Sequence, residues 1–165
     1  MSGETSSDDL QRQRRNRLDC RNRPALAISE FQPEDRLYFS FDQSLVDDEA
    51  TVKTEALRLP DFSCNWSRFS LPEDVRFRRG GRITDGCAAI QVEDVRYEGF
   101  ANAVHDPICD EEPQNYSHVE VRQVPPGGDL QSEPPRRFKK GSKAKRNAWR
   151  RHIRNRLTIL LHPTA

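Results

Sequence analysis

Charge is segregated along this chain, and the segregation limits which part can form a folded body. Residues 24–133 contain ten basic and twenty-two acidic side chains, whereas residues 134–165 contain eleven basic side chains and no acidic one. The overall net charge of +1 therefore conceals an acidic body and a strongly basic C-terminal arm. Only 34% of the residues are hydrophobic, against roughly 45–50% in ordinary globular domains. We expect one domain of about 100 residues rather than a core that spans the chain.

The spacing of apolar residues predicts a small α+β domain, or alternatively a mainly β domain, with a mixed or antiparallel sheet. Alternating or continuous apolar runs predict strands at 37–41, 86–92, 95–105 and 118–124. Apolar positions three or four residues apart, with basic residues between them, predict a basic amphipathic helix at the C-terminal end. The expected organisation is a disordered or marginally helical basic N-terminal arm (1–24), an acidic folded body (25–124), a linker (125–141) and the basic helix (142–161).

The basic arm gives the clearest functional indication. Clustered cations attract the phosphates of nucleic acid, with an affinity that depends on salt rather than on base sequence. Trp149 is expected either to stack on a base or to pack inward. The predicted nucleic-acid contacts are Arg136, Arg137, Lys139, Lys140, Lys143, Lys145, Arg146, Trp149, Arg150, Arg151 and Arg154. The alternatives are docking on the acidic body or on an acidic partner protein, and binding to a membrane surface.

A second group of residues suggests metal-dependent chemistry. Two histidines lie at the ends of expected strands, on either side of an acidic loop. A divalent metal that activates water for hydrolysis could be held by His105, Asp106, His118 and Glu120. The alternative interpretation is that Asp106 and Asn115 shape the loop while His118 is a half-buried structural residue.

The cysteines and the chain termini indicate the compartment. Cys20, Cys64, Cys87 and Cys109 form no C-x-x-C pair, which argues against a structural zinc site. No apolar stretch approaches the ~20 residues of a membrane span, and the first residues lack the apolar segment of a secretory signal. We therefore expect a cytoplasmic protein with reduced, mostly buried thiols, no membrane span and no cofactor.

One motif links the loop to a known set of sequences. Asp106-Pro107, a short loop, Asn115 and the strand start His118-Val119-Glu120 follow one another in the second half of the body. With this motif, residues 36–122 resemble a set of short bacterial proteins of unknown function, in which Pro-Ala stands where this chain has Tyr116-Ser117. The resemblance implies a bacterial protein that works beside a partner, and it implies no activity.

These observations favour a non-enzymatic binding module whose basic arm contacts nucleic acid or an acidic partner. A metal-dependent hydrolase or nuclease that uses the two histidines is the first alternative. The second is a partner-binding or inhibitor protein in a toxin or defence-type pair.

Overall fold

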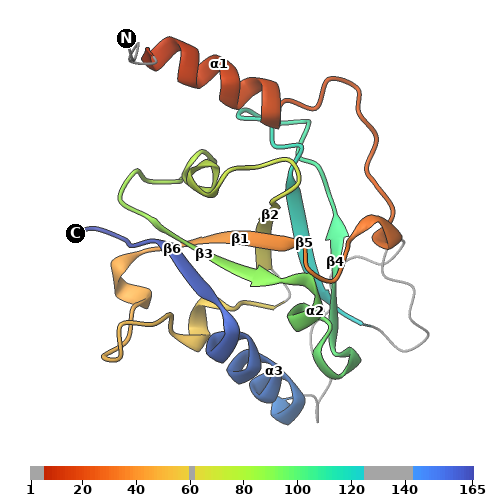
Figure 1. Ribbon diagram of the computed structural model, residues 1–165, viewed down its shortest axis with the longest axis vertical. Coiled ribbons are helices and arrows are strands. Elements are labelled where there is room, and N and C mark those ends of the chain that lie inside the picture. Colours follow the sequence, from red (N-terminus) through yellow and green to blue (C-terminus); the bar gives the residue numbers. More distant parts are fainter. Residues whose placement is uncertain (1–5, 60–61, 125–142) are drawn as a thin grey trace.

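A six-stranded antiparallel sheet forms the centre of the protein, as the computed structural model shows (Figure 1). The strand order is β4-β5-β2-β1-β3-β6. The structure describes residues 6–59, 62–124 and 143–165. The strands are β1 (Arg36–Phe41), β2 (Phe62–Trp66), β3 (Gly86–Gln91), β4 (Ala101–His105), β5 (His118–Gln123) and β6 (Thr158–Leu161). The sheet and its accompanying helices confirm the predicted α+β class.

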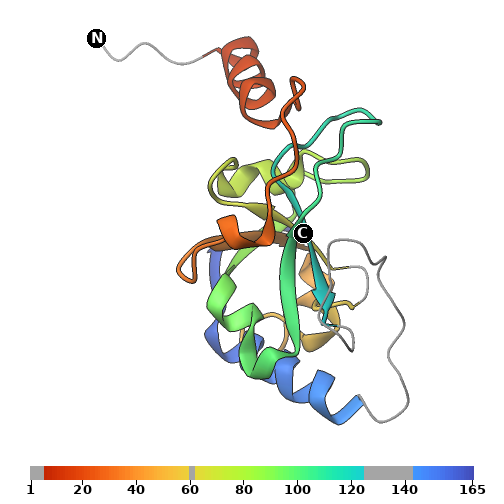
Figure 2. The same ribbon diagram turned by 90° about the vertical axis from the view of Figure 1, so that its right-hand side faces the viewer.

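Helices lie around the sheet rather than in a separate layer. The α-helices are α1 (Ser7–Leu18), α2 (Val92–Val95) and α3 (Lys143–Arg156). Short 3₁₀ helices are η1 (Ile28–Glu30), η2 (Gln43–Leu45), η3 (Thr54–Ala56), η4 (Pro72–Arg76) and η5 (Tyr97–Gly99). Figures 1 and 2 show α1 and α3 at opposite ends of the molecule. None of the helices in the described residues has the length and apolar character needed to cross a membrane.

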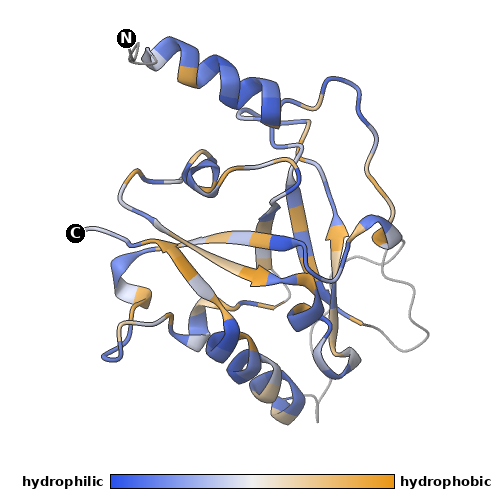
Figure 3. Ribbon diagram, in the orientation of Figure 1, coloured by the Kyte–Doolittle hydropathy of each residue, from blue (hydrophilic) through white to orange (hydrophobic). Residues whose placement is uncertain are grey.

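The period-two pattern of the strands gives the sheet two different faces. One face, which we call the core face, carries Leu37, Phe62 and Val121 and is buried. Trp149 and Ile153 of α3 are completely buried in the same apolar cluster. Hydropathy colouring shows many apolar residues along the central strands and mostly polar residues along α1 and α3 (Figure 3). Because α3 buries these two side chains, it belongs to the folded domain.

The N-terminal arm also packs on the body. The Ser6 side chain accepts a hydrogen bond from the Asp9 backbone N–H and caps α1, which is the role that short polar residues play at helix starts. At the other end of the helix Leu18 is buried, and its backbone oxygen accepts a hydrogen bond from Tyr116 N at 2.6 Å. The arm is therefore helical from Ser7 to Leu18, which is the helical alternative predicted for it, while residues 1–5 lie outside the described residues.

Two sequence-based element assignments differ from the structure. The predicted strand at 95–100 is instead the end of α2 followed by η5, because Glu98 and Gly99 have positive φ values of 56° and 65°. The predicted helix over 142–161 ends at Arg156, and Thr158–Leu161 form the edge strand β6 beside β3. The predicted linker lies almost entirely outside the described residues, which resume at Lys143.

The expectation that all four cysteines are thiols is wrong. Cys20 and Cys109 form a disulfide across a sequence separation of 89 residues. The disulfide joins the segment after α1 to the loop between β4 and β5. Cys64 and Cys87 are free and buried, as predicted for small hydrophobic side chains.

Candidate functional site

A cavity beside the sheet has a row of polar side chains on the face opposite the core face, and its lining also includes core-face residues such as Phe39 and Phe62. Tyr38 pairs with Asn65 across β1 and β2, and Asn65 pairs with His118 across β2 and β5. Directly paired residues point to the same side of a sheet, so these three side chains form one polar row. They line a cavity of about 430 Å³ together with the η4 segment. We call this space the sheet-face cavity.

The cavity opens where two strands separate. Among the described residues, β1 and β2 are paired only at Leu37–Trp66 and Tyr38–Asn65. Beyond Tyr38 the strand β1 continues to Phe41 beside β3 alone, and the segment from Tyr38 to Asp42 lines the cavity. The space is thus a consequence of the short ladder between two central strands.

Of the two histidines in the predicted metal site, His118 faces the cavity and His105 does not. The Nδ1 of His118 lies 2.7 Å from the backbone oxygen of Asp106, and because a carbonyl only accepts, Nδ1 carries the proton. The residue is 9% exposed, and Nε2 has no hydrogen-bond partner among the described residues. The ring is therefore fixed through one nitrogen, while the other nitrogen is left for a ligand.

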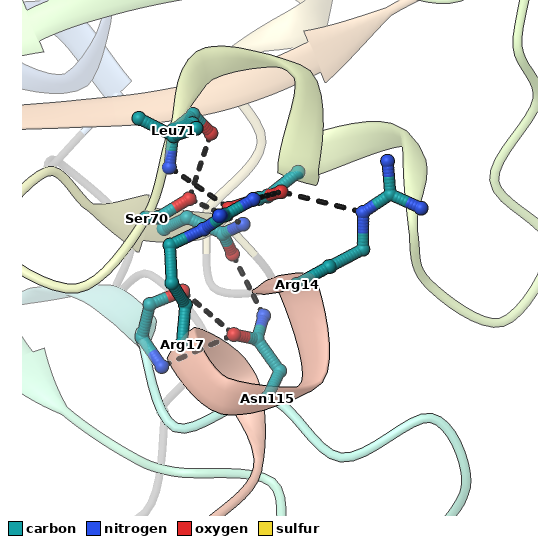
Figure 4. Close-up of polar contacts among 8 residues, drawn as sticks. Arg14, Arg17, Ser70, Leu71 and Asn115 are labelled. Carbon is teal, nitrogen blue, oxygen red and sulfur yellow. Dashed lines mark hydrogen bonds and ion pairs between the residues drawn. The ribbon is translucent and has the colours of Figure 1, made fainter. Parts of the chain in front are cut away.

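Buried amide and hydroxyl groups form hydrogen bonds that hold Asn65, the central residue of the polar row, in place. Asn115 donates from Nδ2 to Asn65 Oδ1 at 2.8 Å, and Asn65 donates to the Ser70 hydroxyl at 3.3 Å. The Oδ1 of Asn115 accepts hydrogen bonds from both the backbone and the hydroxyl of Ser117. Figure 4 shows Asn115 beneath the segment that carries Ser70 and Leu71. Asn115 thus shapes the loop, as the structural interpretation of the motif predicted.

The carboxylate of Asp74 closes one side of the cavity and anchors α1. Its side chain is completely buried and accepts hydrogen bonds from Leu71 N at 2.8 Å and from Arg17 at 2.9 and 3.1 Å. Arg14 adds a longer contact of 3.4 Å (Figure 4). The hydrogen bond to Asp74 raises the pKa of Arg17. Because two guanidinium groups neutralise this carboxylate, it adds little negative charge to the cavity.

Three arginines at the rim of the cavity are unengaged. Arg58, Arg78 and Arg79 line the cavity and are exposed. Within the described residues, none of their guanidinium groups has a hydrogen bond or an ion pair. The acidic side chains of the lining, apart from Asp74, are Asp42, Asp85 and Glu111. The cavity therefore presents unpaired guanidinium groups and several carboxylates around the row of Tyr38, Asn65 and His118.

His105 lies on the other side of the sheet and has a structural role. It pairs with Val119, whose side chain belongs to the core face. Its Nδ1 accepts a hydrogen bond from Leu26 N at 2.9 Å, and its Nε2 lies 2.6 Å from the backbone oxygen of Tyr116. Burial lowers its pKa. Both ring nitrogens are thus used, and the ring is held in its neutral form.

The predicted metal ligands are consequently not brought together. His105 and His118 project from opposite faces of the sheet. Glu120 shares the face of His118 but pairs with Arg122 at 3.2 Å. Within residues 6–59, 62–124 and 143–165, no three His, Cys, Asp or Glu side chains are grouped as a metal ion would require.

The basic helix α3 uses part of its charge to dock on the body. Trp149 donates from Nε1 to the backbone oxygen of Val95 at 2.9 Å, so its indole is an anchor rather than an exposed stacking platform. Arg150 donates to the Leu57 oxygen at 2.9 Å, and burial lowers its pKa. Arg154 forms ion pairs with two acidic side chains of the body, Asp47 and Glu49. Docking on the acidic body, one of the alternatives for this helix, is thus observed.

Other cations of α3 stay exposed. The side chains of Lys143, Lys145 and Arg151 have no hydrogen bond or ion pair with another described residue. Arg146 is half-buried and engaged. The predicted contacts Arg136, Arg137, Lys139 and Lys140 lie outside the described residues. The two lysines stand in the first turn of α3, which contains no acidic residue. Cations at this end oppose the helix dipole, so helix stability does not explain their position.

Some cavity residues outside the motif nevertheless carry a recognisable sequence pattern. Tyr38 and Ser40 are the non-core positions of an alternating strand, and Arg78-Arg79 directly precede a Gly-Gly turn. Arg58 and Asn65 had no such signal, because their place in the cavity depends on strand pairing between distant segments. No protein-family model, curated protein or solved structure matches the chain.

Proposed function

We propose that the protein is a non-enzymatic module that binds nucleic acid through the start of α3 and the basic segment before it. The observation that carries the proposal is the anchoring of α3 by Trp149 and Ile153, which leaves Lys143 and Lys145 exposed in its first turn. The four further cations between 136 and 140 directly precede this turn in the sequence.

Three physical arguments support a phosphate ligand. The start of a helix offers unpaired backbone N–H groups and a positive dipole end, both of which favour phosphate. Adding lysines there increases the attraction to an anion and not the stability of the helix. The body also satisfies Arg154 with its own acids, which leaves the free charge concentrated at the helix start. A repeating phosphate backbone matches a run of cations better than scattered carboxylates do.

Titration of a fluorescent single-stranded oligonucleotide at low salt tests the proposal. We expect Lys143→Glu/Lys145→Glu to weaken binding about tenfold or more. The matched control Arg12→Glu/Arg15→Glu makes the same charge change on exposed positions of α1, at the other end of the molecule, and should change affinity less than about twofold.

Two results would overturn the proposal. Equal losses in the two variants would mean that only the total charge matters. Competition by polyglutamate at the same charge concentration as the oligonucleotide would point instead to an acidic protein partner.

A further inference from the structure

The polar row of the sheet-face cavity lies on the face opposite the anchor of α3 and needs a separate explanation. Its polar row, Tyr38, Asn65 and His118, is buried, although polar side chains are normally buried only when their hydrogen bonds are satisfied. Asn65 is satisfied by Asn115 and Ser70, but Nε2 of His118 has no partner among the described residues. An oriented and unused ring nitrogen on the wall of a cavity is available for a contact with a ligand.

The size of the cavity selects a small molecule. Its volume of about 430 Å³ falls within the roughly 300–1,000 Å³ of typical small-molecule sites. The lining combines the aromatic residues Tyr38, Phe39 and Phe62 with the polar row. A ligand with a flat apolar part and several hydrogen-bonding groups suits this combination.

The rim defines the charge of the ligand. Arg58, Arg78 and Arg79 are exposed and unpaired within the described part of the chain. Guanidinium groups bind phosphate oxygens through paired N–H donors. The carboxylates of Asp42 and Glu111, also in the lining, accept hydrogen bonds from hydroxyl and amino groups. The ligand must therefore carry a phosphate together with hydrogen-bond donors.

We infer that the sheet-face cavity binds a nucleoside monophosphate, with its phosphate at Arg78 and Arg79 and a donor or acceptor of the nucleoside at His118 Nε2. The same chemistry is present in a free nucleotide and in the terminal nucleotide of a strand. The inference does not depend on nucleic-acid binding by α3, because no residue of α3 belongs to the lining of the cavity.

Calorimetric titration with a nucleoside, its 5′-monophosphate and inorganic phosphate tests the assignment. The substitution His118→Asn keeps a donor for the Asp106 oxygen and removes Nε2, so we expect it to weaken both the nucleoside and the nucleotide about tenfold or more. The substitution Arg78→Gln/Arg79→Gln should weaken the nucleotide to a similar extent and leave the affinity for the nucleoside unchanged. Arg12→Gln/Arg15→Gln, the control of equal charge change, should bind as the wild type does.

A further titration distinguishes a free nucleotide from a strand end as the natural ligand. The variant Lys143→Gln/Lys145→Gln is used to compare the affinities of a 5′-phosphorylated oligonucleotide and of the free nucleotide. Tighter binding of the oligonucleotide by this variant would identify a strand end as the natural ligand. Equal or weaker binding would identify the free nucleotide. The assignment is overturned if the folded wild type binds none of the probes, or if His118→Asn binds them unchanged. Neither result affects the oligonucleotide test of α3.

Discussion

Replacing Trp149 with phenylalanine separates the two roles that a tryptophan on a basic helix can have. If the indole stacks on a base, phenylalanine should lower the affinity for nucleic acid and leave stability unchanged. If the indole anchors α3, phenylalanine should lower the stability of the protein and leave its affinity for nucleic acid unchanged. The structure shows an indole with no exposed surface that donates to the Val95 oxygen at 2.9 Å and packs edge-on against Phe62.

The magnitude follows from these contacts. Phenylalanine leaves the buried Val95 oxygen without its donor, at a cost of about 1–3 kcal/mol, and it also vacates part of the indole volume. We expect a total loss of about 2–4 kcal/mol for Trp149→Phe and about 3–5 kcal/mol for Trp149→Ala. With a urea dependence of about 1–3 kcal/mol per molar, the unfolding midpoint of the phenylalanine variant should fall by roughly 1–3 M.

Urea unfolding monitored by circular dichroism measures the loss of stability. Oligonucleotide titration of the folded variant measures the change in affinity for nucleic acid. We expect the phenylalanine variant to bind within about twofold of the wild type once both are folded. A destabilisation below about 0.5 kcal/mol, or a tenfold loss of affinity in a stable variant, would refute the anchoring role.

Three further predictions test other parts of the structure. Asp74→Asn should destabilise the protein by about 2 kcal/mol in urea unfolding, because the Leu71 N–H and two guanidinium groups lose a buried carboxylate; unchanged stability would contradict the docking of α1. The free energy of unfolding should fall as the pH drops below about 6.5. The reason is that burial lowers the pKa of His105 in the folded protein, so the unfolded chain takes up the proton more readily. In His105→Gln the free energy of unfolding should depend less steeply on pH between pH 7 and 5. Thiol titration without reductant should find no reactive group in the folded protein and two after unfolding, because burial raises the pKa of Cys64 well above its usual value and that of Cys87 to about 12; four thiols after unfolding would contradict the disulfide.

Local sequence patterns predicted the strands that carry alternating residues. They predicted secondary structure less accurately where it depends on contacts between distant segments. Arg36–Phe41 and His118–Gln123 were expected almost to the residue, because alternation reports burial on one face directly. Thr158–Leu161 continued a helical spacing, and a four-residue strand cannot be told from a last helical turn by periodicity. Pairing with β3 makes this segment a strand and not a further turn of helix.

The candidate site shows the same division. The motif contains Asn115 and His118, which both line the cavity, whereas the predicted metal site also grouped His105 with His118. The antiparallel register sets His105 opposite Val119, one residue beyond His118, and a shift of one residue changes the face of the sheet. The partner of Cys109 could not be deduced either, since spacing does not determine disulfide connectivity.

The salt dependence of oligonucleotide binding tests the central claim most directly. Each neutralised phosphate contributes roughly 0.7–0.9 to the slope of log affinity against log salt concentration. Lys143→Gln/Lys145→Gln should therefore reduce the magnitude of the slope by about 1.5, while Arg12→Gln/Arg15→Gln should leave it unchanged. An identical slope for the wild type and the α3 variant would show that the start of this helix does not contact the phosphates, and the proposed function would fail.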